Sequence, residues 1–133
     1  MGKCARSILI VEDDMVLSMV ESRMVERLGY RVSGRVKSGE EAVRAVRSER
    51  PDAILMDIKL KGDMDGFDAM RKIRQIEYIP VIYVSGHSTE RSHEKADQLG
   101  YSGYLIKPVR SEDLEEVLTN LFASSAATRA VGS

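Results

Sequence analysis

Short apolar runs alternate along the chain with longer segments in which apolar residues recur at helical spacing. Three of the runs are continuously apolar, which indicates strands covered on both faces of a sheet. The second run is half-polar and contains Gly34, which favours a place at the edge of the sheet. Five strands that alternate with five helices predict an α/β fold with a parallel sheet and helices on both faces. The predicted strands are 8–11, 30–36, 53–56, 81–84 and 104–106.

The first predicted helix carries an apolar stripe that is expected to face inward, and methionines at helical spacing are expected in or near the core. The stripe consists of Leu17, Val20, Met24, Val25 and Leu28.

The fourth predicted helix contains few apolar residues. Between Ser88 and Gly100, only Ala96 and Leu99 are clearly apolar. So little buried area predicts a weakly held helix, which either packs shallowly or is a mobile switching element.

Helical periodicity ends near Ala123, so we predict one domain over 1–123 and a flexible tail or linker stub over 124–133.

The balance of charges excludes several classes of partner. A net charge of −1 from 20 basic and 21 acidic residues argues against direct nucleic-acid binding and against a polybasic membrane anchor. The single cysteine, Cys4, allows no internal disulfide, and no apolar stretch approaches the length that spans a membrane. The chain also lacks a signal-peptide core of its own. These features together predict a cytoplasmic protein without a membrane partner.

Polar residues follow four of the five predicted strands. Because ligands of open parallel sheets bind beyond the carboxyl ends of the strands, these residues should meet at one edge. Asp14 is the exception, since it is better placed to cap the first helix. The residues are Glu12, Asp13 and Asp14 after the first strand, Asp57 after the third, Ser85 after the fourth and Lys107 after the fifth.

Crowded carboxylates repel one another unless a cation lies between them. Oxygen ligands without histidine or cysteine favour Mg²⁺. One of the acids can then act as a nucleophile while the others hold the metal. Lys107 is placed to neutralise a transferred phosphoryl oxygen, and Ser85 to donate a hydrogen bond to another. Phosphoryl transfer requires this kind of positioning and charge neutralisation.

From about Ser7 to Phe122 the chain resembles the receiver domains of two-component response regulators. Each matching segment is short, but their order and their positions at strand ends are specific. The resemblance implies a flavodoxin-like (βα)5 fold with strand order 2-1-3-4-5. The segments are Ile8-Leu9-Ile10-Val11-Glu12-Asp13-Asp14, Met56-Asp57, Met64-Asp65-Gly66, Val84-Ser85-Gly86 and Tyr104-Leu105-Ile106-Lys107-Pro108.

The resemblance implies a role for each strand-end residue. Asp57 is the expected phosphoacceptor, with Mg²⁺ (or Mn²⁺) held by Asp57, by Asp13 directly, by Glu12 through water and by the backbone carbonyl of Lys59. Lys107 is expected to bind the phosphoryl group, and the Lys107–Pro108 bond to be cis.

The resemblance also implies a signalling role. A sensor histidine kinase or a histidine phosphotransfer protein donates the phosphoryl group. Ser85 and Tyr104 then relay its presence to the face made by the fourth helix, fifth strand and fifth helix, where a downstream protein binds. Homodimerisation on phosphorylation is left open. Such a domain promotes its own phosphorylation and dephosphorylation and is not a turnover enzyme.

Two departures from the family pattern concern the segment after Asp57. Receivers usually have proline four residues after the phosphoacceptor, where this chain has Lys61, and the stretch from Asp57 to Gly66 is one residue longer than usual. Lys59 and His87 occupy positions that tune phosphoryl lifetime in the family. Apart from that role, His87 and His93 are expected to be surface residues.

Three other functions fit the sequence less well. A haloacid-dehalogenase-type phosphatase has an Asp-x-Asp pattern, whereas this chain has Asp57-Ile58-Lys59. A degenerate receiver that serves only as an interaction module is disfavoured by the complete set of acid, hydroxyl and lysine. A dinucleotide or flavin binder needs a glycine-rich phosphate loop where this chain has Glu12-Asp13-Asp14.

Overall fold

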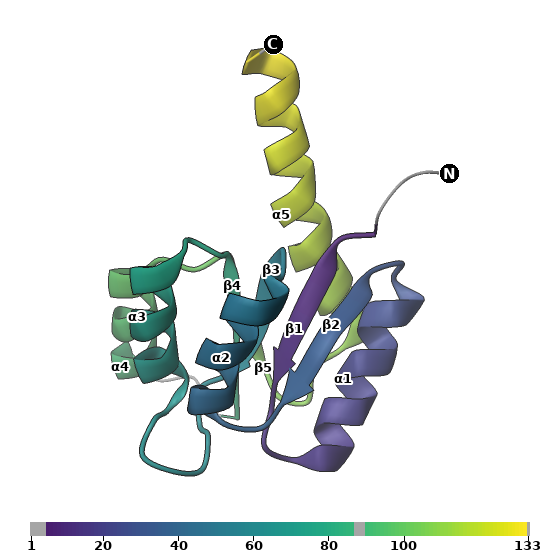
Figure 1. The fold of residues 1–133 in the computed structure, drawn as a ribbon. Helices are drawn as coiled ribbons and strands as arrows, with labels where there is room; N and C mark the ends of the chain where they lie inside the picture. Colours follow the sequence, from purple (N-terminus) through teal and green to yellow (C-terminus); the bar gives the residue numbers. More distant parts are fainter. Residues whose placement is uncertain (1–4, 87–89, 133) are drawn as a thin grey trace.

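Five parallel strands and five helices alternate along the chain (Figure 1). The computed structural model describes residues 5–86 and 90–132. The strands lie in the order β2-β1-β3-β4-β5 and every neighbouring pair is parallel, which confirms the predicted flavodoxin-like order. The elements are β1 (Ser7–Val11), α1 (Met15–Arg27), β2 (Arg31–Val36), α2 (Gly39–Glu49), β3 (Ala53–Asp57), α3 (Gly66–Ile76), β4 (Val81–Ser85), α4 (Glu90–Leu99), β5 (Gly103–Ile106) and α5 (Ser111–Gly132).

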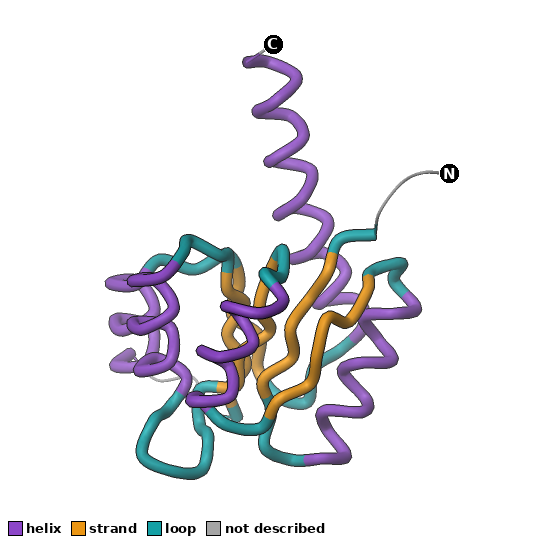
Figure 2. Tube along the Cα trace, viewed as in Figure 1, coloured by secondary structure: helices purple, strands orange, loops and turns teal. Residues whose placement is uncertain are grey.

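The strands form a single layer with helices on both sides (Figure 2). Successive side chains of a strand point to opposite faces, so Leu9 and Val11 belong to one apolar cluster and Ile8 and Ile10 to the other. Helices α2, α3 and α4 cover the first face, and α1 and α5 cover the second. β2 lies at the sheet edge, as its half-polar sequence predicted.

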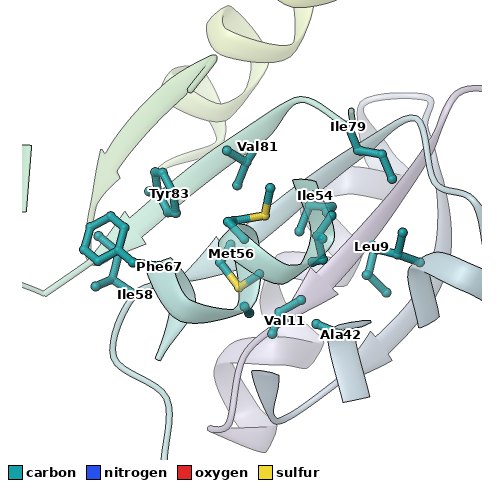
Figure 3. Packing of buried hydrophobic residues seen from close by; sticks show 14 of the residues in the cluster. Leu9, Val11, Ala42, Ile54, Met56, Ile58, Phe67, Ile79, Val81 and Tyr83 are labelled. Carbon is teal, nitrogen blue, oxygen red and sulfur yellow. The ribbon is translucent and has the colours of Figure 1, made fainter. Parts of the chain in front are cut away.

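The first cluster packs side chains of three central strands against α3 (Figure 3). Met56, Tyr83 and Met70 are fully buried there, and Phe67 of α3 lies against Tyr83 with ring centroids 5.0 Å apart. Burial of each large apolar side chain contributes about 1.5–3 kcal/mol. This dense packing fixes the carboxyl ends of β1, β3 and β4 relative to one another.

Helix α1 differs from its predicted orientation. Val20 is 41% exposed rather than inward, and Met15 and Met19 lie outside the core. The N-terminal half of the helix runs beside the charged strand ends, so its buried positions are polar. Leu17 is half-buried, and the other apolar residues of this half face outward. The buried residues of α1 are Ser18, Glu21, Ser22 and Val25, and its exposed apolar residues are Met15, Val16, Met19 and Val20.

Helix α4 is held by few apolar contacts, as its composition predicted. Ala96 is buried and Leu99 is half-buried. Arg74 of α3 adds a polar attachment, because its guanidinium donates hydrogen bonds to the carbonyl oxygens of Leu99 and Gly100. The C-terminal end of α4 is therefore anchored to α3.

Helix α5 extends further than the periodicity predicted. It continues to Gly132 and projects beyond the sheet (Figure 1). Ala126, Ala127 and Ala130 are strong helix formers, and no proline interrupts the segment. The assignment of 124–133 to a tail or linker stays a prediction. Within the described part of the chain, no helix is both long and apolar enough to cross a membrane.

Candidate functional site

The carboxyl ends of β1, β3, β4 and β5 line a cleft of about 510 Å³. Six of the seven residues predicted from the sequence meet there, and Tyr104 is the exception. Ser92 of α4 also lines the cleft. No sequence pattern indicated Ser92, because a serine near the start of a polar helix has no distinctive context. The six residues are Glu12, Asp13, Asp57, Lys59, Ser85 and Lys107.

Lys107 lies between two buried carboxylates. Its Nζ donates a hydrogen bond to Asp57 Oδ2 at 3.1 Å and lies 3.1 Å from Glu12 Oε1. The second contact is an ion pair, since Glu12 Oε1 accepts no hydrogen bond of good geometry from the described residues. Glu12 is 1% exposed and Asp57 is 3% exposed. One ammonium therefore offsets the repulsion between two desolvated acids.

The local environment shifts the pKa values of these groups. The pKa of Glu12 is raised to about 7. Burial raises it most, the N–H of Asp14 lowers it by donating to Glu12 Oε2 at 3.1 Å, and the Asp57 carboxylate raises it. Burial opposes the charged form of Lys107, but its hydrogen bond to Asp57 and the adjacent negative charges outweigh this, so the Lys107 pKa is raised. The positive charge of Lys107 therefore does not fully offset the burial and the repulsion that raise the Glu12 pKa.

Three carboxylates are close enough to share a cation. Glu12, Asp13 and Asp57 each offer an oxygen, and these oxygens lie within 4.8 Å of one another. Glu12 Oε1 is buried and, among the described residues, has the Lys107 ammonium at 3.1 Å but accepts no hydrogen bond. A set made only of carboxylate oxygens suits Mg²⁺ or Mn²⁺ better than a softer metal. The residues therefore fit the metal site that the sequence predicted.

Asp14 stands apart from this set, as the sequence predicted. Its side chain accepts hydrogen bonds from the backbone N–H groups of Val16 and Leu17 at 2.9 and 3.0 Å. Asp14 is thus the N-cap of α1.

The segment between β3 and α3, residues 58–65, closes one side of the cleft. The N–H of Lys59 donates to Asp57 Oδ1 at 3.2 Å, and the N–H of Lys61 donates to Asp13 Oδ2 at 3.0 Å. Gly66, the first residue of α3, approaches β3 so closely that a Cβ there would lie 2.5 Å from the carbonyl oxygen of Asp57. This segment thus contacts both the central acid and the acid at the end of β1.

Tyr104 of β5 lies next to α4 rather than in the cleft. Its side chain is half-buried, and its hydroxyl is buried without a hydrogen-bond partner in the described part of the chain. The ring stacks on His93 of α4 with centroids 4.2 Å apart. His93 is half-buried, and the polar sequence around it did not indicate this aromatic contact. His87 lies outside the described residues.

The backbone after β5 joins this region to β4. The N–H of Lys107 donates to the carbonyl oxygen of Ser85 at 2.8 Å. The Lys107–Pro108 bond is cis, as predicted.

The family model of the response regulator receiver domain matches residues 8–119, most of the chain and all of the strands that form the cleft. The chain belongs to this family. Receiver domains are signalling switches that interact with histidine kinases and downstream effectors. The predicted family is thus confirmed.

Relatives of this receiver domain occur in several kinds of protein. It is 32% identical over 109 residues to the transcriptional regulatory protein PdtaR of Mycobacterium tuberculosis, covering 82% of this chain and 53% of PdtaR. The chain thus spans about half the length of this relative. The signal receiver domain of a modulated diguanylate cyclase from Desulfovibrio desulfuricans has a TM-score of 0.85 at 30% identity, covering 94% of this chain and 99% of that one.

A third relative is the receiver domain of the sensor histidine kinase PA1611 from Pseudomonas aeruginosa. Its TM-score is 0.78 at 37% identity, and the match covers 88% of this chain and 97% of that one. That structure holds a magnesium ion coordinated in its active-site cleft.

Proposed function

We propose that this receiver domain is a phosphorylation-activated switch in which Asp57 accepts a phosphoryl group from a phosphohistidine donor in a reaction that depends on Mg²⁺. The observation that supports this most strongly is the placement of Lys107 3.1 Å from both Asp57 Oδ2 and Glu12 Oε1. Two buried carboxylates and the Lys107 ammonium thus meet at the carboxyl ends of three strands. Phosphoryl transfer needs such an arrangement to position and neutralise charge.

The chain's own residues then have distinct tasks. A carboxylate oxygen of Asp57 attacks the phosphorus, so an O–P bond forms while the N–P bond of the donor breaks and the histidine nitrogen keeps the electron pair. Lys107 and Ser85 bind the transferred phosphoryl oxygens. Glu12, Asp13, Asp57 and the carbonyl of Lys59 hold the metal, which when bound neutralises charge on the phosphoryl group. The domain promotes this transfer and later loss of the phosphoryl group, but is not a turnover enzyme.

The readout passes through Ser85 and Tyr104 to the face formed by α4, β5 and α5. Tyr104 supports this proposal because its ring already lies against α4. Ile106, two residues further along β5, is 46% exposed and offers apolar contact area on this edge strand. We propose that a downstream protein, or a second phosphorylated copy, binds this face, without direct contact to nucleic acid.

The donor, a sensor histidine kinase or a histidine phosphotransfer protein, is proposed to dock on α1. The exposed stripe of Met15, Val16, Met19 and Val20 begins directly beside the cleft and offers apolar area to a partner. The single cysteine suits a reducing compartment and supports a cytoplasmic location for this exchange.

The phosphoacceptor is tested with acetyl phosphate, a small donor that needs no docking surface. The wild-type domain is expected to gain one phosphoryl group in the presence of Mg²⁺ and none after chelation, as read by intact-protein mass spectrometry. Asp57→Asn is expected to remain unlabelled. Undiminished labelling of this variant would exclude Asp57 as the acceptor.

The docking surface is tested separately with Val16→Glu. This variant is expected to accept phosphoryl groups from acetyl phosphate at the wild-type rate but from a phosphorylated kinase at least about tenfold more slowly, since it places a charge in an apolar contact. Equal loss with both donors would indicate damage to the site and not to docking.

A further inference from the structure

The β3–α3 segment presents two backbone donors to two different acids of the cleft. Lys59 N–H bonds Asp57 at 3.2 Å and Lys61 N–H bonds Asp13 at 3.0 Å. The two donors are two residues apart in the sequence. Leu60, the residue between them, is 8% exposed and points into the core cluster beneath.

Packing, rather than the Lys61 side chain, fixes the direction of these amides. The Lys61 side chain is exposed, whereas Ile58 and Leu60 are buried. Met64 fills the space above Gly39, where a Cβ would lie 2.8 Å from its sulfur. The N–H of Gly66 closes the segment by donating to the carbonyl oxygen of Ile58 at 2.8 Å. The amide of Lys61 is therefore held towards the cleft by neighbours on both sides.

Asp13 differs from the other two acids in what orients it. Lys107 contacts both Glu12 and Asp57. Asp13 is only half-buried, and the hydrogen bond that the structure shows for its carboxylate comes from Lys61. A hydrogen bond from a neutral donor to a carboxylate is stronger than one between neutral groups. It can therefore fix the rotamer of an otherwise mobile acid.

We propose that the backbone N–H of Lys61 is a positioning group for the metal ligand Asp13, so that the β3–α3 segment and the metal site form one cooperative unit. The proposal rests on the proposed role of Asp13 in holding Mg²⁺. The proposal also gives the residue type at position 61 a consequence. Proline, which the family resemblance leads one to expect there, has no N–H to donate, whereas lysine has one. The segment would carry a metal ligand, the Lys59 carbonyl, and orient another, Asp13.

Two substitutions at the same position separate the amide from the side chain. Lys61→Pro removes the N–H, and Lys61→Ala keeps it while removing the ammonium. Titration with MgCl₂ by calorimetry is expected to show affinity about tenfold weaker for Lys61→Pro and within about twofold of wild type for Lys61→Ala. Equal affinities of the two variants would overturn the proposal. Tighter binding by Lys61→Pro would also overturn it, because the bond would then favour the metal-free form.

A second measurement does not depend on proline being tolerated. In the metal-free wild type, hydrogen exchange followed by NMR is expected to show a protected Lys61 amide. Asp13→Ala is expected to speed its exchange about tenfold, whereas Asp63→Ala, at an exposed acid of the same segment, should not. Exchange of the wild-type amide at the unprotected rate overturns the positioning role. Failure of wild type to bind Mg²⁺ in the titration contradicts instead the proposed function.

Discussion

The imidazole of His93 stacks on the ring of Tyr104, with ring centroids 4.2 Å apart and ring planes inclined by 25°. This contact joins α4 to the edge strand β5. It matters because α4 buries so little else: Ala96 is buried and Leu99 is half-buried. An aromatic pair contributes about 0.5–1.5 kcal/mol beyond its buried area. The position of α4 is therefore tied to the orientation of Tyr104.

His93→Ala is expected to loosen this attachment. The ring protons of Tyr104 should move downfield in the NMR spectrum, because the shielding by the stacked imidazole is lost, and the amides of α4 should exchange faster. Gln98→Ala, at an exposed position of the same helix, is the matched control and should change neither. A Tyr104 spectrum unaltered by His93→Ala would contradict the structural contact.

Glu21 makes the stability of the metal-free domain dependent on pH. Burial, together with the nearby Glu12 carboxylate, raises its pKa from 4.5 to about 8. Between these values the folded state keeps a proton that the unfolded state has released, so increasing pH favours unfolding. The stability is complete below the unfolded pKa of 4.5 and is lost as the pH rises through the folded pKa of about 8.

Glu21→Gln is therefore expected to be more stable than wild type at pH 8.5, by about 2–4 kcal/mol, and nearly equal to it at pH 4.5. Urea unfolding followed by circular dichroism at both pH values measures the difference. Glu26→Gln, on the exposed side of α1, should shift neither value by more than about 0.5 kcal/mol. A gain of the same size at both pH values would show that ionisation of Glu21 is not its cause.

Gly66→Ala is expected to disturb β3, the strand that ends in Asp57. The new Cβ would lie 2.5 Å from the carbonyl oxygen of Asp57 and 2.9 Å from the Cα of Ile58, so backbone must move. Overpacking of this kind costs about 1–3 kcal/mol, which the urea midpoint measures. Gly86→Ala adds a Cβ that has no atom of the described residues within 4 Å, and it controls for the change of residue type. Equal midpoints for the two variants would refute the close approach.

Mg²⁺ is expected to stabilise the wild-type domain by about 1–3 kcal/mol at a concentration well above its dissociation constant. Asp13→Asn should lose most of this gain, because one of three clustered carboxylates becomes a neutral amide. Without metal the same variant should equal or exceed wild-type stability, since repulsion within the cleft falls. Thermal unfolding with and without Mg²⁺ measures both effects. A full Mg²⁺-dependent gain in the variant would remove Asp13 from the metal site.

The apolar runs predicted the strands well because strands that are buried on both faces are apolar at nearly every position. The same runs located Glu12, Asp57 and Lys107, since each residue directly follows or ends a strand. Val20 was misplaced because an apolar residue on a helix faces either the core or a partner, and periodicity alone does not distinguish the two. The contact of Lys61 with Asp13 spans 48 positions and uses a backbone atom, so no residue type could reveal it.

The outward-facing apolar residues of α1 lie outside both core clusters. Substitutions at these exposed positions would alter the surface on which we propose that the donor docks, while the core clusters stay unchanged; the residues are Met15, Val16, Met19 and Val20. On the proposed docking mode, a duplicated copy of this domain could acquire a new donor through a few replacements on one helix. The fold and the cleft at the strand ends depend on other residues and need not change with them.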